Sequence, residues 1–189
     1  VNEKKQYGYL RNMLVNTRLF SEEALKFSTQ GFYCGDPPGS VPYFEYWSEQ
    51  LRRCQEGYTV GDTRITGHHY FYLNFCQIKL TEHVGKKKAG IKTVSFPNFW
   101  DGDYEYFHAL ERAADLGKHL IVAKARRKGF SYKNAAIAAN IYNSRRNTYT
   151  LLCAHDKKYL YPKGIMTMVT DYLNFLNEHT GWQKRRQTV

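Results

Sequence analysis

Residues 120–131 read LIVAKARRKGFS, and this stretch decides which fold the sequence predicts. Its first four residues, Leu120 to Ala123, form a short apolar run that is typical of a buried strand. A basic loop begins at Lys124 and ends at Gly129, where the chain can turn into an alanine-rich segment, 133–143, that favours a closely packed helix. Strand, loop and helix in this order are the first half of a βαβ unit.

The segments that follow continue the same pattern. Residues 148–154 are apolar enough for the next strand, and residues 164–178 have the spacing of a helix. A helix between two strands at these lengths predicts a parallel pair joined by a right-handed crossover. We therefore expect an α/β domain with a parallel sheet over residues 96–189.

Residues 1–95 are expected to form a separate lead-in subdomain of mixed α+β structure. Helices are predicted over 21–31 and 42–57, where serine, proline and glycine supply start and stop signals. Gly61 suits a hairpin turn, whereas the spacing of the aromatic run at 65–75 fits either a helix or a strand.

The next segments lead up to the α/β domain. Strand-like segments at 77–80 and 91–94 flank an exposed basic turn at 86–90. A helix from Asp101 or Asp103, either of which could cap it, should run to about residue 116 and stop at Gly117.

The charge of the chain is concentrated in its last part. The net charge is +11, yet residues 1–117 carry 14 basic and 14 acidic side chains, while residues 118–189 carry 14 basic and 3 acidic ones. Such an excess indicates an anionic partner, which could be a nucleotide, a nucleic acid or an acidic protein surface, although a solvated basic face would look the same. No apolar run is long enough to cross a bilayer, and the four cysteines lack metal-ligand spacing, so we expect neither a membrane partner nor a metal knuckle.

The loop before the alanine-rich helix has the features of a phosphate site. A loop that leaves a strand and enters a helix presents backbone N–H groups and the positive end of the helix dipole. Gly129 permits a tight turn, Ser131 could ligate Mg²⁺, and Phe130 stands where the usual phosphate loop has lysine. Lys124, at the head of the loop, could reach the same phosphate oxygens. A plain basic loop that binds nothing is the alternative interpretation.

Three patches of the chain resemble one family. Residues 124–131 resemble the deviant Walker A motif of large terminase subunits, the DNA-packaging motor ATPases of tailed bacteriophages, in some of which the lysine also heads the loop. Residues 65–75 and 99–107 look like the segments that precede the ATPase core in these proteins. The resemblance implies the first part of a P-loop NTPase of the ASCE type, with a parallel sheet and helices on both of its faces.

By this resemblance, the loop would bind ATP and Mg²⁺. Lys124 would contact the β- and γ-phosphates, Arg127 would act at the γ-phosphate or at a neighbouring subunit, and Ser131 would hold the metal. Phe99, Trp100 and Tyr104 would stack on adenine, unless they are ordinary core aromatics. The expected ATP-binding residues are Lys124, Arg126, Arg127, Lys128, Gly129, Phe130, Ser131, Trp100 and Tyr104.

The resemblance further implies a motor that moves double-stranded DNA into a procapsid in the host cytoplasm. Its expected partners are a portal protein, a small terminase subunit and further copies of itself in a ring. Phosphoryl transfer needs an acidic Walker B pair after a later strand, and none occurs in this sequence, so the 189 residues alone are not expected to hydrolyse ATP. That pair and a nuclease domain would follow residue 189.

The basic residues of the last part of the chain are candidates for DNA binding. Backbone phosphates of DNA could be held by Arg145, Arg146, Lys157, Lys158, Lys184, Arg185 and Arg186. The alternative is a non-enzymatic basic module that binds nucleic acid or a capsid.

Overall fold

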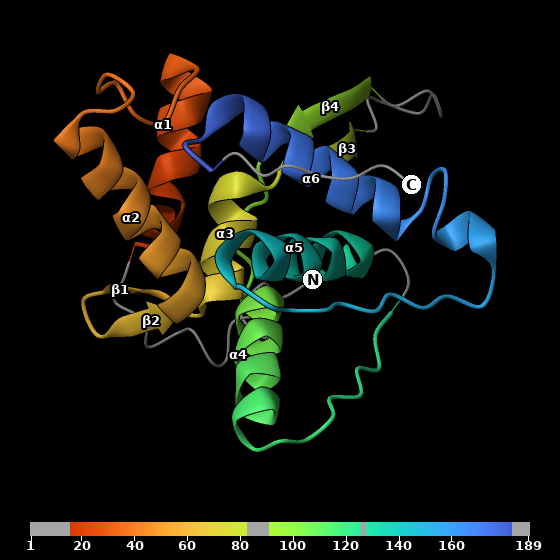
Figure 1. Cartoon of the computed structure of the whole chain (residues 1–189). Helices are drawn as coiled ribbons and strands as arrows, with labels where there is room; N and C mark the ends of the chain where they lie inside the picture. The colour runs from red at the N-terminus through yellow and green to blue at the C-terminus, as the bar shows by residue number, and fades with distance from the viewer. Residues whose placement is uncertain (1–15, 83–90, 126–127, 183–189) are drawn as a thin grey trace.

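The computed structural model describes residues 16–82, 91–125 and 128–182, in which helices surround one short central helix (Figure 1). Two small hairpins lie at the edges of this helical body. In chain order the elements are η3 (Thr17–Ser21), α1 (Glu22–Gln30), α2 (Val41–Glu56), β1 (Tyr58–Val60), β2 (Thr63–Ile65), α3 (Gly67–Phe75), β3 (Ile78–Glu82), β4 (Ile91–Ser95), α4 (Asp101–Asp115), α5 (Phe130–Ser144), η4 (Lys157–Tyr159) and α6 (Ile165–His179).

The prediction of a parallel α/β sheet, and with it the P-loop NTPase fold, is wrong for the described residues. Both sheets have two antiparallel strands, β1 with β2 and β3 with β4. The segments expected as parallel strands, 120–123 and 148–154, form no strand and run as irregular chain outside the helices (Figure 1). Ile121 and Leu151 are 93% and 70% exposed, because no neighbouring strand covers them. An apolar run makes a buried strand only where other strands accept its hydrogen bonds, and here α5 packs on helices instead.

Helix α3 lies at the centre of the fold, and it settles the ambiguity of the aromatic run. The hydroxyl of Thr66 accepts a hydrogen bond from the His69 N–H and so begins the helix. Every residue of α3 except His68 is buried, and the helix contacts α1, α2, α4, α5 and α6. A helix that is apolar on all sides has to be buried on all sides, which explains why its sequence showed no single periodic face.

Asn74, near the end of α3, fastens this helix to the first part of the described chain. Its side-chain oxygen accepts from the Ala24 N–H at 3.1 Å, and its amide nitrogen donates to the carbonyl of Phe20 at 2.8 Å. The hydroxyl of Tyr33 donates to the Asn74 carbonyl at 2.7 Å. These buried bonds satisfy groups that would otherwise be costly inside the core.

The helix ends predicted at glycines are confirmed. Gly31 ends α1 with a φ of 80°, and Ser40 begins α2 by accepting from the Tyr43 N–H. Gly117, with a φ of 61°, ends α4: its N–H donates to the Ala114 carbonyl and the Lys118 N–H donates to the Ala113 carbonyl. This bond pair is a Schellman motif, so Gly117 and Lys118 are a helix stop, as expected. The turn at Gly61 between β1 and β2 and the antiparallel pairing of β3 with β4 are also confirmed. The basic turn predicted at 86–90 lies outside the described residues.

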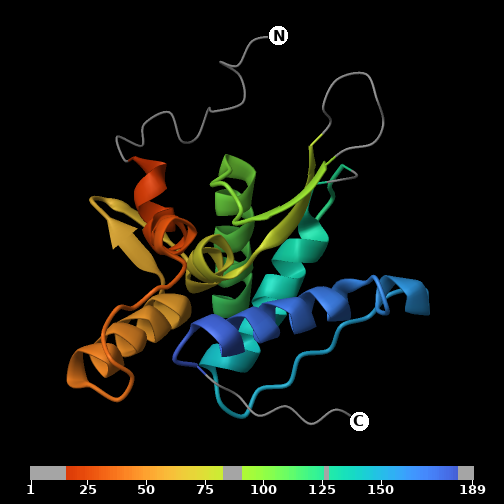
Figure 2. The ribbon, with the colours of Figure 1, turned by 90° about the horizontal axis from the view of Figure 1, so that it is seen from above.

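Helices α5 and α6 cross beside α3 and complete the core (Figure 2). The small side chains of Ala135, Ala136 and Ala139 are fully buried, which lets the neighbouring helices approach α5 closely. The resulting hydrophobic core is continuous from Phe20 to Leu176 and so contains residues from both sides of the expected boundary after residue 95. Within the described parts of the chain, none of the helices has both the length and the apolar character that a bilayer crossing requires.

The contrast between an exposed apolar segment and the buried α3 gives a test of this fold. Replacing Ile121 by alanine should change the free energy of unfolding by no more than about 0.5 kcal/mol, because its side chain is already in water. Replacing the fully buried Leu73 by alanine should cost about 2–5 kcal/mol. Urea unfolding followed by circular dichroism measures both values. A loss at Ile121 as large as that at Leu73 would show that residue 121 belongs to a buried strand.

Candidate phosphate-binding loop

The loop that enters α5 has the backbone geometry of an anion site. Gly129 precedes the helix in the left-handed region, with φ 70° and ψ 10°, and its carbonyl accepts from the N–H groups of Tyr132 and Lys133 at 3.0 and 3.2 Å. The N–H groups of Phe130 and Ser131 come before these first helical bonds, as the leading N–H groups of any helix do. They are therefore available to a ligand at the positive end of the helix dipole.

Lys124 turns back from the head of the loop toward the start of α5. Its ammonium lies 5.7 Å from the centre of the Phe130 ring, although the residue as a whole is exposed. Lys128 and Ser131 are exposed as well. The loop thus places a lysine ammonium and a serine hydroxyl at one helix N-terminus. Arg126 and Arg127 lie outside the described residues.

Phe130 belongs to the contact between α4 and α5. Its ring is half-buried and meets the ring of Tyr106 edge-on, with the centroids 4.9 Å apart. The hydroxyl of Tyr106 in turn donates to the side-chain oxygen of Asn134 at 2.7 Å. The aromatic side chain in the position of the usual lysine therefore anchors the first turn of α5 on α4.

Beneath Phe130 lies a buried ion pair. The Lys133 ammonium donates to the carboxylate of Asp103 on α4, and the two residues are only 3% and 7% exposed. Burial raises the pKa of Asp103, and the hydrogen bond and charge of Lys133 oppose that rise. Because Lys133 also lies 4.3 Å from the Phe130 ring centre, it is committed to the helix contact and is not free to bind phosphate.

The prediction that Asp101 or Asp103 caps α4 is wrong. Trp100 is the N-cap residue, and no side-chain hydrogen bond caps the described helix. Asp103 turns inward to Lys133 instead. Sequence spacing gives no signal of this pair, because its two residues lie on different helices that only the tertiary fold brings together.

The expected magnesium ligand meets the simplest requirement of a metal site. Ser131 is exposed at the second position of α5, where a hydroxyl can reach an ion held by phosphate. No group of three or more His, Cys, Asp or Glu side chains that could hold a metal occurs within the described residues. Ser131 is the side chain that the described part of the loop would offer to an ion held by phosphate.

The expected adenine-stacking residues divide between the core and the surface. Phe99 stacks at 5.7 Å on Phe20, and Tyr104 lies 4.1 Å from the ring centre of His108. Trp100 is 58% exposed. The ring that reaches Phe130 and the loop is that of Tyr106, which the sequence did not single out.

His69 is buried in the same aromatic cluster. Its ring lies between those of Phe99 and Phe107, at 5.1 and 4.9 Å between centroids, and is fully buried. Neither ring nitrogen has a hydrogen-bond partner among the described residues. Burial, assisted by the charges of His108 and Lys133, lowers the pKa of His69 to about 3, so the ring is neutral. It acts as a core residue.

Comparisons of the chain with protein-family models, curated proteins and solved structures found no match in any of the three.

Breaking the buried ion pair should destabilise the protein strongly. Lys133→Met or Asp103→Asn alone should each cost about 3–5 kcal/mol, because either change leaves a buried polar partner uncompensated. The double change Asp103→Leu with Lys133→Met should cost less than either single one. As a control, Lys79→Ala removes the exposed pair with Asp171 and should cost at most about 1 kcal/mol. Denaturant unfolding measures all four variants; equal effects of Lys133→Met and Lys79→Ala would contradict a buried pair.

The buried histidine should make stability depend on pH. The pKa of His69 is about 3 in the native protein, below the ordinary 6.5. At pH values between these two, the unfolded chain therefore binds a proton that the native protein does not bind. Above pH 6.5 the ring is neutral in both states, and His69 does not make the free energy of unfolding depend on pH. Below pH 6.5 the free energy of unfolding falls on acidification, by at most about 1.4 kcal/mol per pH unit. His68, whose burial lowers its pKa to about 4, acts in the same direction.

The variant His69→Leu should therefore lose less stability than the wild type between about pH 6 and pH 4. The exposed His155, changed to glutamine, is the control and should keep the wild-type slope. Urea unfolding at several pH values measures these slopes. Identical slopes for His69→Leu and the wild type would mean that His69 is not buried in its neutral form.

Proposed function

We propose that the loop 124–131 binds the phosphates of ATP with Mg²⁺, and that the chain is the nucleotide-binding, N-terminal part of a DNA-packaging ATPase of the large terminase kind. The observation that carries this proposal is the position of the Lys124 ammonium. It is turned back to within 5.7 Å of the Phe130 ring centre, at the first residue of α5 and directly after Gly129.

Electrostatics explains why this arrangement suits a triphosphate. The N–H groups that begin α5 can donate to phosphate oxygens, and the helix dipole favours negative charge there. Lys124 and Lys128 add positive charge at the same place, and neither forms an ion pair within the described residues. A phosphate would therefore replace water around cations that have no carboxylate to neutralise them.

Each residue of the loop has a distinct role in this proposal. Lys124 contacts the β- and γ-phosphates, Gly129 keeps the backbone close to them, and Ser131 holds the ion. Mg²⁺ neutralises part of the phosphate charge when bound. Arg127 is assigned to the γ-phosphate by the family resemblance alone. Because the sequence has no acidic Walker B pair, the proposal for these 189 residues is nucleotide binding, with hydrolysis left to the whole motor.

The remaining parts of the proposal follow from the resemblance to terminases. In that role the protein would move double-stranded DNA into a procapsid, as one copy of a ring that meets a portal protein and a small terminase subunit in the host cytoplasm. The loop geometry supports the nucleotide site without reference to a parallel sheet, which the described residues do not form.

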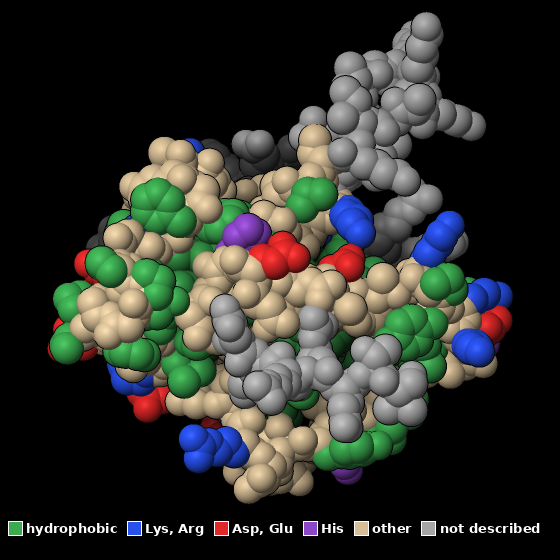
Figure 3. All heavy atoms as spheres, turned by 45° about the horizontal axis from the view of Figure 1, so that its top comes forward, with side chains coloured by type: hydrophobic (Ala, Val, Ile, Leu, Met, Phe, Trp, Pro, Cys, Tyr) green, Lys and Arg blue, Asp and Glu red, His purple; other side chains and the backbone are tan. Residues whose placement is uncertain are grey.

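A second candidate is a non-enzymatic module that grips nucleic-acid phosphates with exposed cations. It is favoured by Lys157 and Lys163, which form no ion pair within the described residues. Figure 3 shows Lys and Arg side chains gathered at the side of the molecule where η4 lies. The absence of parallel strands beside α5 among the described residues also favours this candidate.

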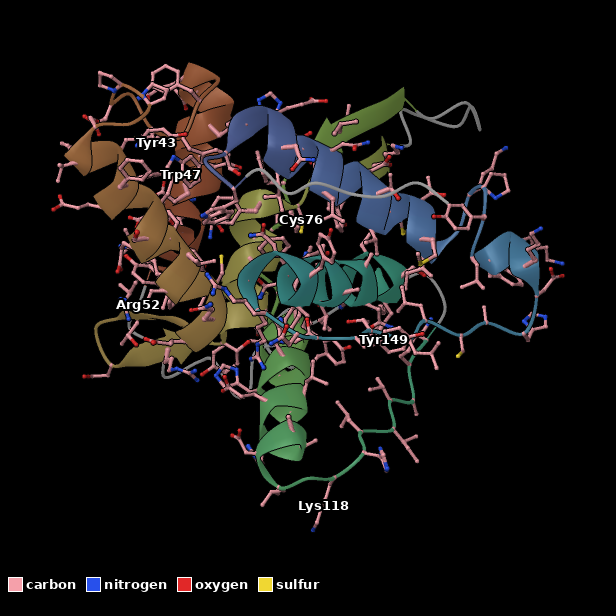
Figure 4. The ribbon with its side chains drawn as sticks, viewed as in Figure 1. Tyr43, Trp47, Arg52, Cys76, Lys118 and Tyr149 are labelled. Atoms are coloured by element: carbon pink, nitrogen blue, oxygen red, sulfur yellow. The ribbon has the colours of Figure 1, made fainter. Side chains whose placement is uncertain are left out.

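Nucleotide titration separates the two functions. Isothermal calorimetry with ATP and Mg²⁺ should show binding to the wild-type chain, and Lys124→Ala should weaken it about tenfold or more, through loss of a charged hydrogen bond. Lys118→Ala is the matched control: this exposed lysine points away from the body at the turn after α4 (Figure 4) and should leave the affinity unchanged. Equal affinities for the Lys124 and Lys118 variants would refute the proposed loop. Binding of DNA without any binding of ATP would support the second candidate.

A further inference from the structure

The opposite end of α5 borders a cavity with two arginines in its wall. An open cavity of about 650 Å³ lies where the ends of α2, α5 and α6 meet, and Arg145 and Arg146 contribute to its wall. Helix α5 has 15 residues, which separates this cavity from Gly129 by about 22 Å. The cavity is therefore distinct from the phosphate-binding loop.

Arg145 and Arg146 bring positive charge to the place where the C-terminal ends of α2, α5 and α6, the negative ends of their dipoles, meet. Arg145 and Arg146 are exposed, neither forms an ion pair within the described residues, and no acidic side chain is among the described residues that line the cavity. The field of Arg145 extends to His68, where it adds to the effect of burial in lowering the pKa of that histidine. Two guanidinium groups without carboxylates are suited to a phosphate, whose oxygens accept paired N–H bonds.

A buried amide in the wall also lacks its acceptor. Asn143 is 5% exposed, and its side-chain nitrogen has no hydrogen-bond partner among the described residues. The neighbouring amide of Gln55 is already used, because it donates to the Ser144 carbonyl. A buried donor without an acceptor is costly, so a ligand with an oxygen or ring nitrogen at this place would remove that cost.

Other lining residues of the cavity, Trp182 and Leu51, are apolar, and Trp182 is packed against further aromatic rings. The indole N–H of Trp182 donates to the Trp47 carbonyl at 3.3 Å, and its ring lies 5.1 Å from that of Trp47 and 5.0 Å from that of Phe75. Trp47 projects from α2 toward this cluster (Figure 4). Leu51 extends the apolar surface. A planar ring can pack on such a wall while a phosphate meets the arginines.

We propose that this cavity binds one unpaired nucleotide unit of a single-stranded nucleic acid. The phosphate lies on Arg145 and Arg146, the base packs against Trp182, and the Asn143 amide donates to the base or the sugar. A duplex does not satisfy this site, because its bases are paired and stacked and cannot enter a cavity. This site is separate from the proposed ATP site, because it lies at the other end of α5 and uses none of the same residues.

The test uses a short, fluorescein-labelled oligodeoxythymidylate and measures its anisotropy as the chain is added. The double variant Arg145→Gln with Arg146→Gln should weaken binding about tenfold or more, and should lower the slope of log affinity against log salt by about 0.7 for each phosphate that is no longer neutralised. Lys157→Gln with Lys158→Gln removes the same formal charge at η4, away from the cavity lining, and should weaken binding far less. Lys124→Ala should leave it unchanged.

Competition by AMP, the effects of the variants and binding of a duplex decide whether the cavity holds a nucleotide unit. Displacement of the labelled strand by unlabelled AMP would support the proposal, because it would show that one nucleotide unit fills the site. Equal weakening by the arginine and lysine double variants would overturn the proposal in favour of diffuse charge attraction. A duplex whose binding depends on Arg145 and Arg146 as strongly as that of the single strand would also overturn it, as would no binding at all. Loss of oligonucleotide binding in Lys124→Ala alone would assign the strand to the loop instead.

Discussion

The burial of α3 on nearly all sides is the constraint on which the rest of the structure depends. A short helix that is apolar on nearly every side can be stable only if other elements cover all of it, and five helices do so. Gly67 allows a close approach of α3 to α2, because a Cβ at this position would collide with the Cys54 carbonyl of α2. That same carbonyl accepts from Asn140 of α5 at 2.8 Å, so α2, α3 and α5 meet at one point.

The position of α5 follows from this arrangement and determines where both candidate sites lie. Its alanine face packs on α3 and α6, while Lys133 and Phe130 join its first turn to α4. The helix is thereby held along its length, and its two ends remain accessible. One end offers N–H groups and lysines; the other ends at two arginines beside a cavity. Both ends of the same rigid helix present positive charge to an anionic ligand.

Local signals predicted the helix ends and both hairpins, but they also predicted a parallel sheet that the described residues do not form. Capping residues, proline positions and glycines with positive φ act within a few residues of the helix end, so the ends of α1, α2 and α4 could be derived from the sequence. A strand of a parallel sheet has no such local signal, because its hydrogen bonds come from a distant segment. Leu120 to Ala123 looked like a buried strand, yet Ile121 lies in solvent, since apolar character alone does not supply a neighbouring strand.

By itself the sequence determined the charge asymmetry, the glycine at the head of α5 and the lysines around it. These are properties of single residues and of short spacings. Only the tertiary structure decided that Lys133 is neutralised by Asp103, that Tyr106 and not Trp100 reaches the loop, and that Arg145 shares a cavity with Trp182. Each of these contacts joins residues on different elements, and packing around α3 determines which of them meet.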